Sequence, residues 1–167
     1  MISETAAPGV KSSLAHLPRE LIESSGFLLS LLGGAAKTYW VEELEESGFN
    51  PYHVRILIFL DEGASETQAA IADSLEIDRS QLVGLLDKLE QSGFVERRPD
   101  PNDRRNQMVS LTAAGRRQLA KFRTSAKRVE DEILAPLDAR SRSQLHDLLL
   151  RLAVFHDPRC VYDENEP

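Results

Sequence analysis

Ser80 and Gln81 carry side chains that can bond the edges of DNA bases, and they open a segment with helical periodicity. Leucines at positions 82, 85, 86 and 89 form the inward face of that helix, which leaves Ser80 and Gln81 on the outer side of its first turn. A Gln amide bonds adenine through two hydrogen bonds, and a Ser hydroxyl bonds a base or a phosphate. Alone, the two residues are more typical of an ordinary polar first turn, and it is the predicted wing downstream that favours base contacts.

A second polar cluster, Asp103-Arg104-Arg105, lies in a stretch rich in Pro, Asn and Asp. Arginines on a loop beside a DNA-reading helix can enter the minor groove, which is most negative where it is narrow. An acid there repels phosphate unless it holds an arginine, so we expect Asp103 to orient a neighbouring guanidinium. The alternative is a solvated charged turn.

The distribution of charge supports nucleic-acid binding although the chain as a whole is acidic. The formal net charge is −7, and phosphate contacts require Lys and Arg. Residues 78–128 nevertheless hold twelve Lys and Arg against six Asp and Glu, a local charge of +6 that leaves −13 for the rest of the chain. Basic residues gathered in one third of the chain are typical of a DNA-binding surface.

The elements around Ser80 have the pattern of a helix-turn-helix. Residues 67–75 predict a short helix, residues 76–77 turn the chain, and Asp78 can cap a second helix over 79–91. Upstream, Asn50-Pro51 predicts the start of a largely buried helix over 52–60. Gly48 and Gly93 each precede a Phe at the end of a helical pattern, as in left-handed helix C-caps.

Two short strands follow the second helix of this pair. Residues 94–98 and 106–111 alternate in polarity around the turn-rich loop that holds Asp103, which predicts a β-hairpin wing. The predicted fold class is therefore mainly α with a small β-hairpin wing (α+β), a winged helix-turn-helix with N- and C-terminal helices.

Helical patterns also flank the winged segment. We expect a short helix from Pro18 through Ile22, with Gly26 as its stop, and a long helix from Phe27 to about residue 44. After Thr112, a near-heptad seam runs through Leu119, Phe122, Ala126, Val129, Ile133 and Leu137, and residues 141–155 form a further amphipathic helix. These stripes have no obvious core within the chain, so we expect a homodimer to bury them.

The predicted organisation has five parts. They are a flexible tail over 1–17, N-terminal dimerisation helices over 18–48, a DNA-binding lobe over 49–111, C-terminal dimerisation helices over 112–157 and an acidic tail over 158–167.

Several classes of protein are disfavoured. Cys160 is the only cysteine, so neither an internal disulfide nor a four-thiolate zinc site is possible. The four histidines are scattered and no nucleophile motif accompanies them, so we expect no enzyme, no metal and no cofactor. No signal segment or membrane span is recognisable, and we expect a cytoplasmic protein.

The stretch from Asp78 to Gly115 resembles the MarR family of bacterial regulators. The resemblance is carried by the recognition-helix segment DRSQLVGLLDKLE, by GFVERRPDPNDRR, and by VSLTAAG, with the family's Asp, Arg and aliphatic spacing on Asp103, Arg105 and Val109. It implies a homodimer on a pseudo-palindromic operator of double-stranded DNA, usually a repressor released by a small, often aromatic or anionic ligand. The family often has Thr-Arg where this chain has Val83-Gly84, so base contacts should depend on Ser80 and Gln81, with Arg79 and Lys88 on phosphates.

The predicted sites follow from these elements together with the resemblance. The expected DNA contacts are Thr67, Gln68, Arg79, Ser80, Gln81, Gly84, Lys88, Arg97, Arg98, Asp103, Arg104 and Arg105. The matching ligand region offers Lys37, Tyr39, Trp40, His53 and Arg55, which are also compatible with packing or surface roles. The alternative function is a ligand-independent winged-helix protein, either an architectural DNA binder or a protein-interaction module.

Overall fold

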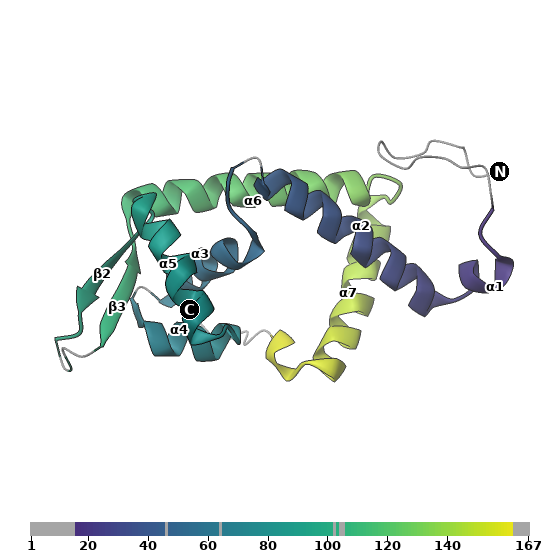
Figure 1. Ribbon diagram of the computed structural model, residues 1–167. Helices are drawn as coiled ribbons and strands as arrows, with labels where there is room; N and C mark the ends of the chain where they lie inside the picture. The colour runs from purple at the N-terminus through teal and green to yellow at the C-terminus, as the bar shows by residue number, and fades with distance from the viewer. Residues whose placement is uncertain (1–15, 46, 64, 102, 104–105, 162–167) are drawn as a thin grey trace. The chain divides into compact units, whose positions relative to one another are not determined.

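The computed structural model describes residues 16–45, 47–63, 65–101, 103 and 106–161. The chain divides into two compact units, residues 1–37 and 38–167. The described helices and strands, most of which Figure 1 labels, are α1 (Arg19–Ile22), α2 (Ser25–Glu45), α3 (Pro51–Gly63), β1 (Glu66–Thr67), α4 (Gln68–Leu75), α5 (Arg79–Gln91), β2 (Val95–Pro99), β3 (Gln107–Leu111), α6 (Ala113–Ile133), α7 (Ala139–His156) and the 3-10 turn η1 (Pro158–Cys160). A mainly helical chain with one small antiparallel sheet confirms the predicted fold class.

Polar caps fix where helices α4 and α6 of the second unit begin. Oγ1 of Thr67 accepts a hydrogen bond from the amide of Ala70 at 3.1 Å and starts α4. Oγ1 of Thr112 accepts from the amide of Gly115 at 3.0 Å and starts α6. Each cap satisfies an amide that has no partner inside its helix, which fixes the first turn.

Two glycines end helices as predicted. Gly48 and Gly93 have φ values of +73° and +71°, a conformation that costs glycine little. After each turn the amide of the following Phe donates back to a leucine carbonyl, Phe49 to Leu44 at 3.2 Å and Phe94 to Leu89 at 2.9 Å. These bonds turn both phenyl rings back toward the core.

The sheet has the strand order β1-β3-β2, all antiparallel. The predicted wing is confirmed, with Val95 opposite Leu111 and Arg97 opposite Val109. The first strand was not predicted, because β1 pairs only Glu66 and Thr67 with β3 and two residues show no alternation.

One hydrophobic core joins the lobe elements. The inward leucines of α5 are all buried as predicted, and they meet Ile56, Leu57 and Leu60 of α3 and Val95 and Val109 of the sheet. In Figure 1, α5 lies beside the wing.

The seam of α6 differs from its prediction in two respects. Leu119 and Phe122 are buried in the lobe core, and Val129 is also buried within the chain, so these residues do not need a partner subunit. Leu137 lies beyond the helix, because α6 ends at Ile133 and Asp138 caps α7.

The short N-terminal helix runs through Ile22 as predicted, but the expected stop at Gly26 is wrong. The helix stops at Ile22, and Oγ of Ser24 then accepts from the amide of Phe27 at 3.2 Å, so Gly26 lies inside α2. No helix in the described ranges is long and apolar enough to cross a membrane.

Replacing Gly115 with Ala should strongly destabilise the lobe. A Cβ at this position would fall inside the contact distance of the Phe94 carbonyl oxygen, where α6 crosses the entry to the wing. We expect Gly115→Ala to lower the free energy of unfolding by about 2 to 3 kcal/mol, although Ala is the better helix former. Urea unfolding measures this, with Gly33→Ala as control because its added Cβ meets nothing within 4 Å. Equal stability of Gly115→Ala and the parent would contradict this close approach.

Candidate nucleic-acid interface

The first turn of α5 is organised by Asp78. Its Oδ1 accepts from the amides of Ser80 at 2.9 Å and Gln81 at 3.3 Å, and also from the Ser80 hydroxyl. These hydrogen bonds stabilise the ionised carboxylate and lower the pKa of Asp78 below its ordinary value. The bond from the Ser80 hydroxyl has the largest effect. The side chains of Ser80 and Gln81 are exposed beyond this cap. Because the Ser80 hydroxyl donates its proton to Asp78, Oγ of Ser80 can only accept a hydrogen bond from another group.

The outer face of α5 is otherwise open. Arg79 is 75% exposed and lies 3.8 Å from a carboxylate oxygen of Asp73, a distance at which solvent screens most of the attraction. A Cβ at Gly84 would meet nothing within 4 Å, so no packing within the described chain requires glycine there. Nζ of Lys88 lies 5.7 Å from the centre of the Phe49 ring. This face therefore offers cations and hydrogen-bonding groups on a rigid helix.

Thr67 and Gln68 stand at the start of α4. Both are partly buried, and the Thr67 hydroxyl already caps that helix. Their predicted contact with DNA stays a prediction.

The two arginines of β2 lie in different surroundings. The Arg98 side chain is 73% exposed and bonds Glu96 on its own strand at 3.0 Å. The Arg97 side chain is only 17% exposed and points to α5, where it meets Asp87 at 2.5 Å and Glu90 at 3.6 Å. The guanidinium predicted to contact DNA is therefore held inside the lobe.

The tip of the wing is only partly described. The carbonyl of Asp103 accepts from the amide of Asn106 at 2.8 Å, and the Asn106 carbonyl accepts from Asp100 at 3.0 Å, which closes the hairpin. Arg104 and Arg105 lie outside the described residues. The predicted pairing of Asp103 with an arginine therefore stays a prediction.

The residues predicted to hold a ligand are mostly committed to other contacts. His53 is buried, its Nδ1 accepts from the amide of Asn50 at 3.1 Å, and its ring meets Phe49 edge-on. Burial, and secondarily the Lys88 charge, lowers its pKa, so His53 is a neutral core residue rather than a partner for a carboxylate. Arg55 donates to the Leu75 carbonyl at 3.1 Å.

The remaining three predicted ligand residues lie in or next to α2's second half. Trp40 packs against the lobe core, Tyr39 is partly buried, and Lys37 is exposed as the last residue of the first unit. The ligand role of Lys37, Tyr39 and Trp40 stays a prediction.

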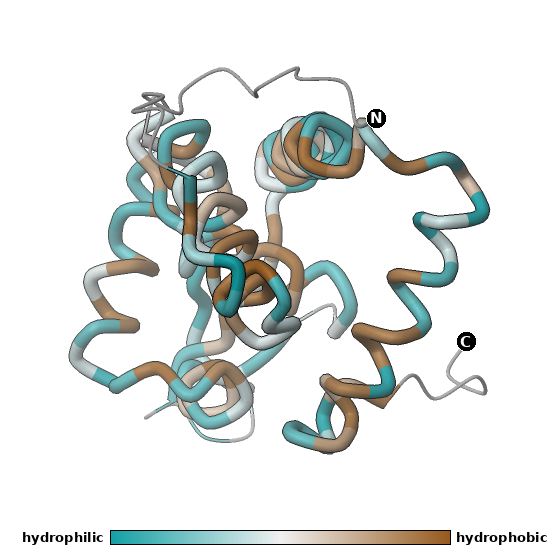
Figure 2. The backbone as a smooth tube through the Cα atoms, turned by 90° about the vertical axis from the view of Figure 1, so that its right-hand side faces the viewer, coloured by the Kyte–Doolittle hydropathy of each residue, from teal (hydrophilic) through white to brown (hydrophobic). Residues whose placement is uncertain are grey.

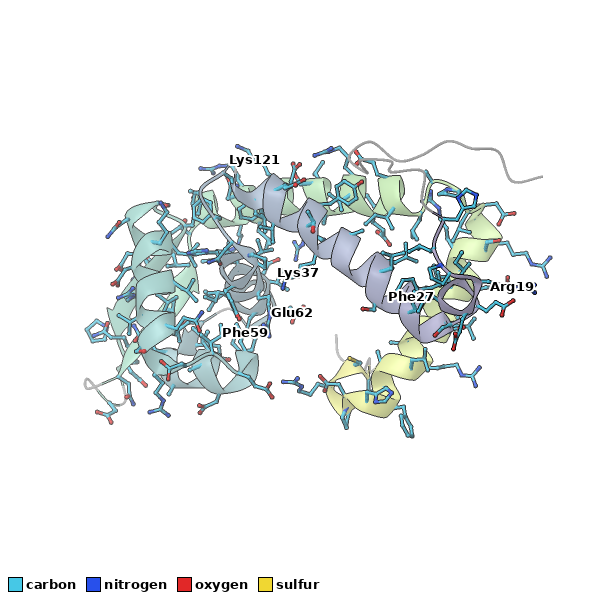
Figure 3. The ribbon with its side chains drawn as sticks, turned by 45° about the vertical axis from the view of Figure 1, so that its right-hand side comes forward. Arg19, Phe27, Lys37, Phe59, Glu62 and Lys121 are labelled. Carbon is cyan, nitrogen blue, oxygen red and sulfur yellow. The ribbon has the colours of Figure 1, made fainter. Side chains whose placement is uncertain are left out.

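The sequence did not indicate a hollow of about 290 Å³ between the end of α2 and α6. Figure 3 labels Lys121, which α6 contributes to it. The carboxylate of Glu43 accepts from Oγ of Ser125 at 2.9 Å and from Arg128, and the Arg128 bond chiefly lowers the pKa of Glu43. No local sequence pattern indicates such a hollow, because the residues that line it come from segments far apart in the sequence. The lining residues are Glu43, Ser47, Gln118, Lys121, Phe122 and Ser125.

The cap of α5 should make stability depend on pH in a defined direction. Because folding lowers the pKa of Asp78, its stabilisation is present above the ordinary Asp range and is lost as pH falls through the lowered value. We expect Asp78→Ala to lower the urea midpoint at pH 7, with the gap to the parent narrowing below about pH 4. Asp78→Asn is the control. Asn caps helices as well as Asp does, so this variant should keep the parent's urea midpoint at pH 7. A gap that is the same at both pH values would exclude this ionised cap.

Comparison with known proteins agrees with this architecture. The MarR family model matches residues 49–106. A putative transcriptional regulatory protein for the hcr operon of Thauera aromatica is 33% identical over 86 residues, 52% of each chain, so that match spans about half of the relative. The uncharacterized HTH-type transcriptional regulator YdgJ of Bacillus subtilis is 29% identical over 125 residues, 75% of this chain and 76% of the relative.

Solved structures give the same answer at the level of the fold. Wild-type apo MarR from E. coli superimposes with a TM-score of 0.69 at 25% identity, covering 77% of this chain and 96% of that one. A mutant MarR from E. coli complexed with operator DNA has a TM-score of 0.62 at 25% identity, covering 78% and 94%. These relatives are regulators of transcription and not enzymes. The capped helix α5 beside the antiparallel wing thus lies largely in the segment that matches the MarR family model, and the fold is that of solved MarR structures, so the chain is similar to DNA-binding transcriptional regulators of the MarR family.

Proposed function

We propose that this regulator is a homodimeric repressor that binds a pseudo-palindromic operator in the cytoplasm and is released by a small aromatic or phenolic acid. The observation that carries the proposal is the outer face of α5, with Ser80 and Gln81 exposed above a fixed cap and the wing alongside. The solved operator complex of a relative with the same fold supports it.

The proposed contacts divide by chemistry. Gln81 and the acceptor oxygen of Ser80 read base edges in the major groove, while Arg79 and Lys88 bind phosphates. Gly84 lets the helix backbone approach the bases, since no side chain stands between them there. Thr67 and Gln68 contribute from the start of α4. Arg98, Arg104 and Arg105 contribute from the wing, and Asp103 orients an arginine.

The homodimer is supported by apolar surface that the chain leaves uncovered. No residue of α7 is buried, and Leu148, Leu152 and Phe155 are 55%, 49% and 82% exposed. Hydrophobic positions recur along this helix in Figure 2. Apolar side chains repeated on one helix favour a protein partner, and twofold symmetry matches a palindromic site.

The chain offers two places for an acidic aromatic ligand. Tyr39 and Trp40 remain candidates to stack on an aromatic acid, with Lys37 as a cation near them in sequence. The hollow beside Lys121 is a second candidate, since its Glu43 carboxylate is already paired with Arg128. Both candidates offer a cation for an acidic ligand.

Footprinting tests the function as a whole. The full chain is mixed with duplexes selected from a randomised pool at a stated salt concentration, with and without a panel of benzoic and phenolic acids. A repressor of this kind protects two half-sites about one helical turn apart, prefers them by roughly 10³ or more over random DNA, and loses them to one of the acids. Weak binding without sequence preference or ligand effect would favour the architectural or interaction module instead.

A single amide distinguishes base reading from phosphate binding. If Gln81 bonds a base, Gln81→Ala should relax preference at one position of each half-site and cost roughly 1 to 3 kcal/mol of binding free energy. Titration against duplexes carrying each base at each position measures this. Gln91→Ala is the matched control, the same change at the other end of α5. Equal weakening on every duplex would place Gln81 on phosphate.

The dimer can be weakened without touching the DNA-binding lobe. Replacing both Leu148 and Leu152 with Gln should raise the dimer dissociation constant about tenfold or more, because each buried leucine contributes about 1.5 to 3 kcal/mol. Sedimentation velocity across a concentration series measures the change. Arg151→Gln, on the same helix, should leave the dimer intact. A double variant that dimerises like the parent would exclude this face of α7 from the interface.

A further inference from the structure

Arg97 makes the most buried ion pair among the described residues. Its side chain is 17% exposed, against 73% for Arg98 next to it on β2. Nη2 lies 2.5 Å from Oδ1 of Asp87, and Nε lies 3.6 Å from Oε2 of Glu90. One guanidinium on the wing therefore spans two carboxylates spaced three residues apart on the recognition helix.

The position of these groups determines what the ion pair can do. Asp87 and Glu90 flank Lys88 in the sequence of α5, close to the cation proposed to bind phosphate. Their side chains are 48% and 44% exposed, so both carboxylates remain close to solvent. Without a cation beside them, two negative charges would stand near the surface that DNA approaches, and like charges at an interface oppose binding.

The same contact restrains the wing. Arg97 lies at the middle of β2, opposite Val109 of β3, and both strands lead toward the wing tip. An arginine bonded to carboxylates holds its planar fork in a defined orientation, which a lysine cannot reproduce. The contact thus fixes the hairpin against α5 at a point outside the hydrophobic core.

We propose that Arg97 is a positioning residue for operator binding, which docks the wing onto the recognition helix and neutralises Asp87 and Glu90, and does not itself contact DNA. This inference rests on the proposed operator binding. It also replaces the prediction that Arg97 binds DNA, because the side chain is only 17% exposed and its guanidinium is paired with Asp87 and Glu90 of α5.

A double-mutant cycle on the full-length protein tests the proposal. Arg97→Met removes the charge and keeps much of the length, and it is made both in the parent and in a background carrying Asp87→Asn and Glu90→Gln. Affinity is measured on one duplex selected from the randomised pool. Amide hydrogen exchange of β2 and β3 is measured without DNA, and urea unfolding checks that each variant is folded.

Dependence on the two acids is the expected result. Arg97→Met should weaken binding about tenfold or more in the parent and by about twofold or less in the neutral background, with faster exchange in the hairpin of the Met variant. Arg97→Lys should fall between Met and the parent, and it carries the test if Met fails to fold. An equal loss in both backgrounds, or no loss in the parent, would overturn the proposal. Failure of the parent to select any duplex would instead overturn the proposed function.

Discussion

The structure depends on α5 having one face buried and the other left free. Leu82, Leu85, Leu86 and Leu89 are at most 7% exposed, and a fully buried leucine contributes about 1.5 to 3 kcal/mol. This burial holds the helix rigidly enough for Gln81 to present its amide at a fixed place. A surface loop with the same polar residues would lose much of its binding energy to ordering. Burial of these leucines therefore contributes to the affinity proposed for the operator, because it fixes the helix that presents Gln81.

Aromatic side chains connect this helix to the rest of the second unit. The Phe49 ring centre lies 5.4 Å from that of Phe94 and 5.9 Å from that of Phe122. Phe49 follows the glycine after α2, Phe94 follows the glycine after α5, and Phe122 comes from α6. Lys88 lies over the Phe49 ring, at 5.7 Å from its centre. The hollow beside Phe122 is thus in contact with the packing that supports the recognition helix.

The acidic side chains near the proposed DNA-binding surface are mostly paired with arginines or used as a helix cap. An acidic chain binds a polyanion only if its carboxylates are kept from the contact surface or neutralised there. Asp78 is used as a helix cap, Glu96 lies beside Arg98, and Asp87 and Glu90 share Arg97. Four of the six acids in residues 78–128 therefore cap a helix or pair with an arginine, which leaves the exposed cations of α5 for the proposed phosphate contacts.

The sequence by itself determined the helices, the wing and the face of α5 that is proposed to read DNA. Leucine periodicity, capping residues such as Thr67, Asp78 and Thr112, and the glycine stops are local signals, because each acts within about one turn of chain. The resemblance to the MarR family added the Asp103 to Val109 motif, and the MarR family model matches residues 49–106. Which residues contact DNA or a ligand is not settled by these signals.

Only the tertiary structure decided which polar groups face inward. Arg97 and Arg98 are adjacent and chemically identical, yet one is bonded to α5 and the other is exposed, because strand side chains alternate between two faces. The imidazole of His53 is a side chain that could bind a ligand, yet it is buried like a core residue. The two-residue strand β1 and the hollow between α2 and α6 exist only through partners more than 40 residues away. Such contacts are set by the packing of distant segments, which leaves no periodic trace in the sequence.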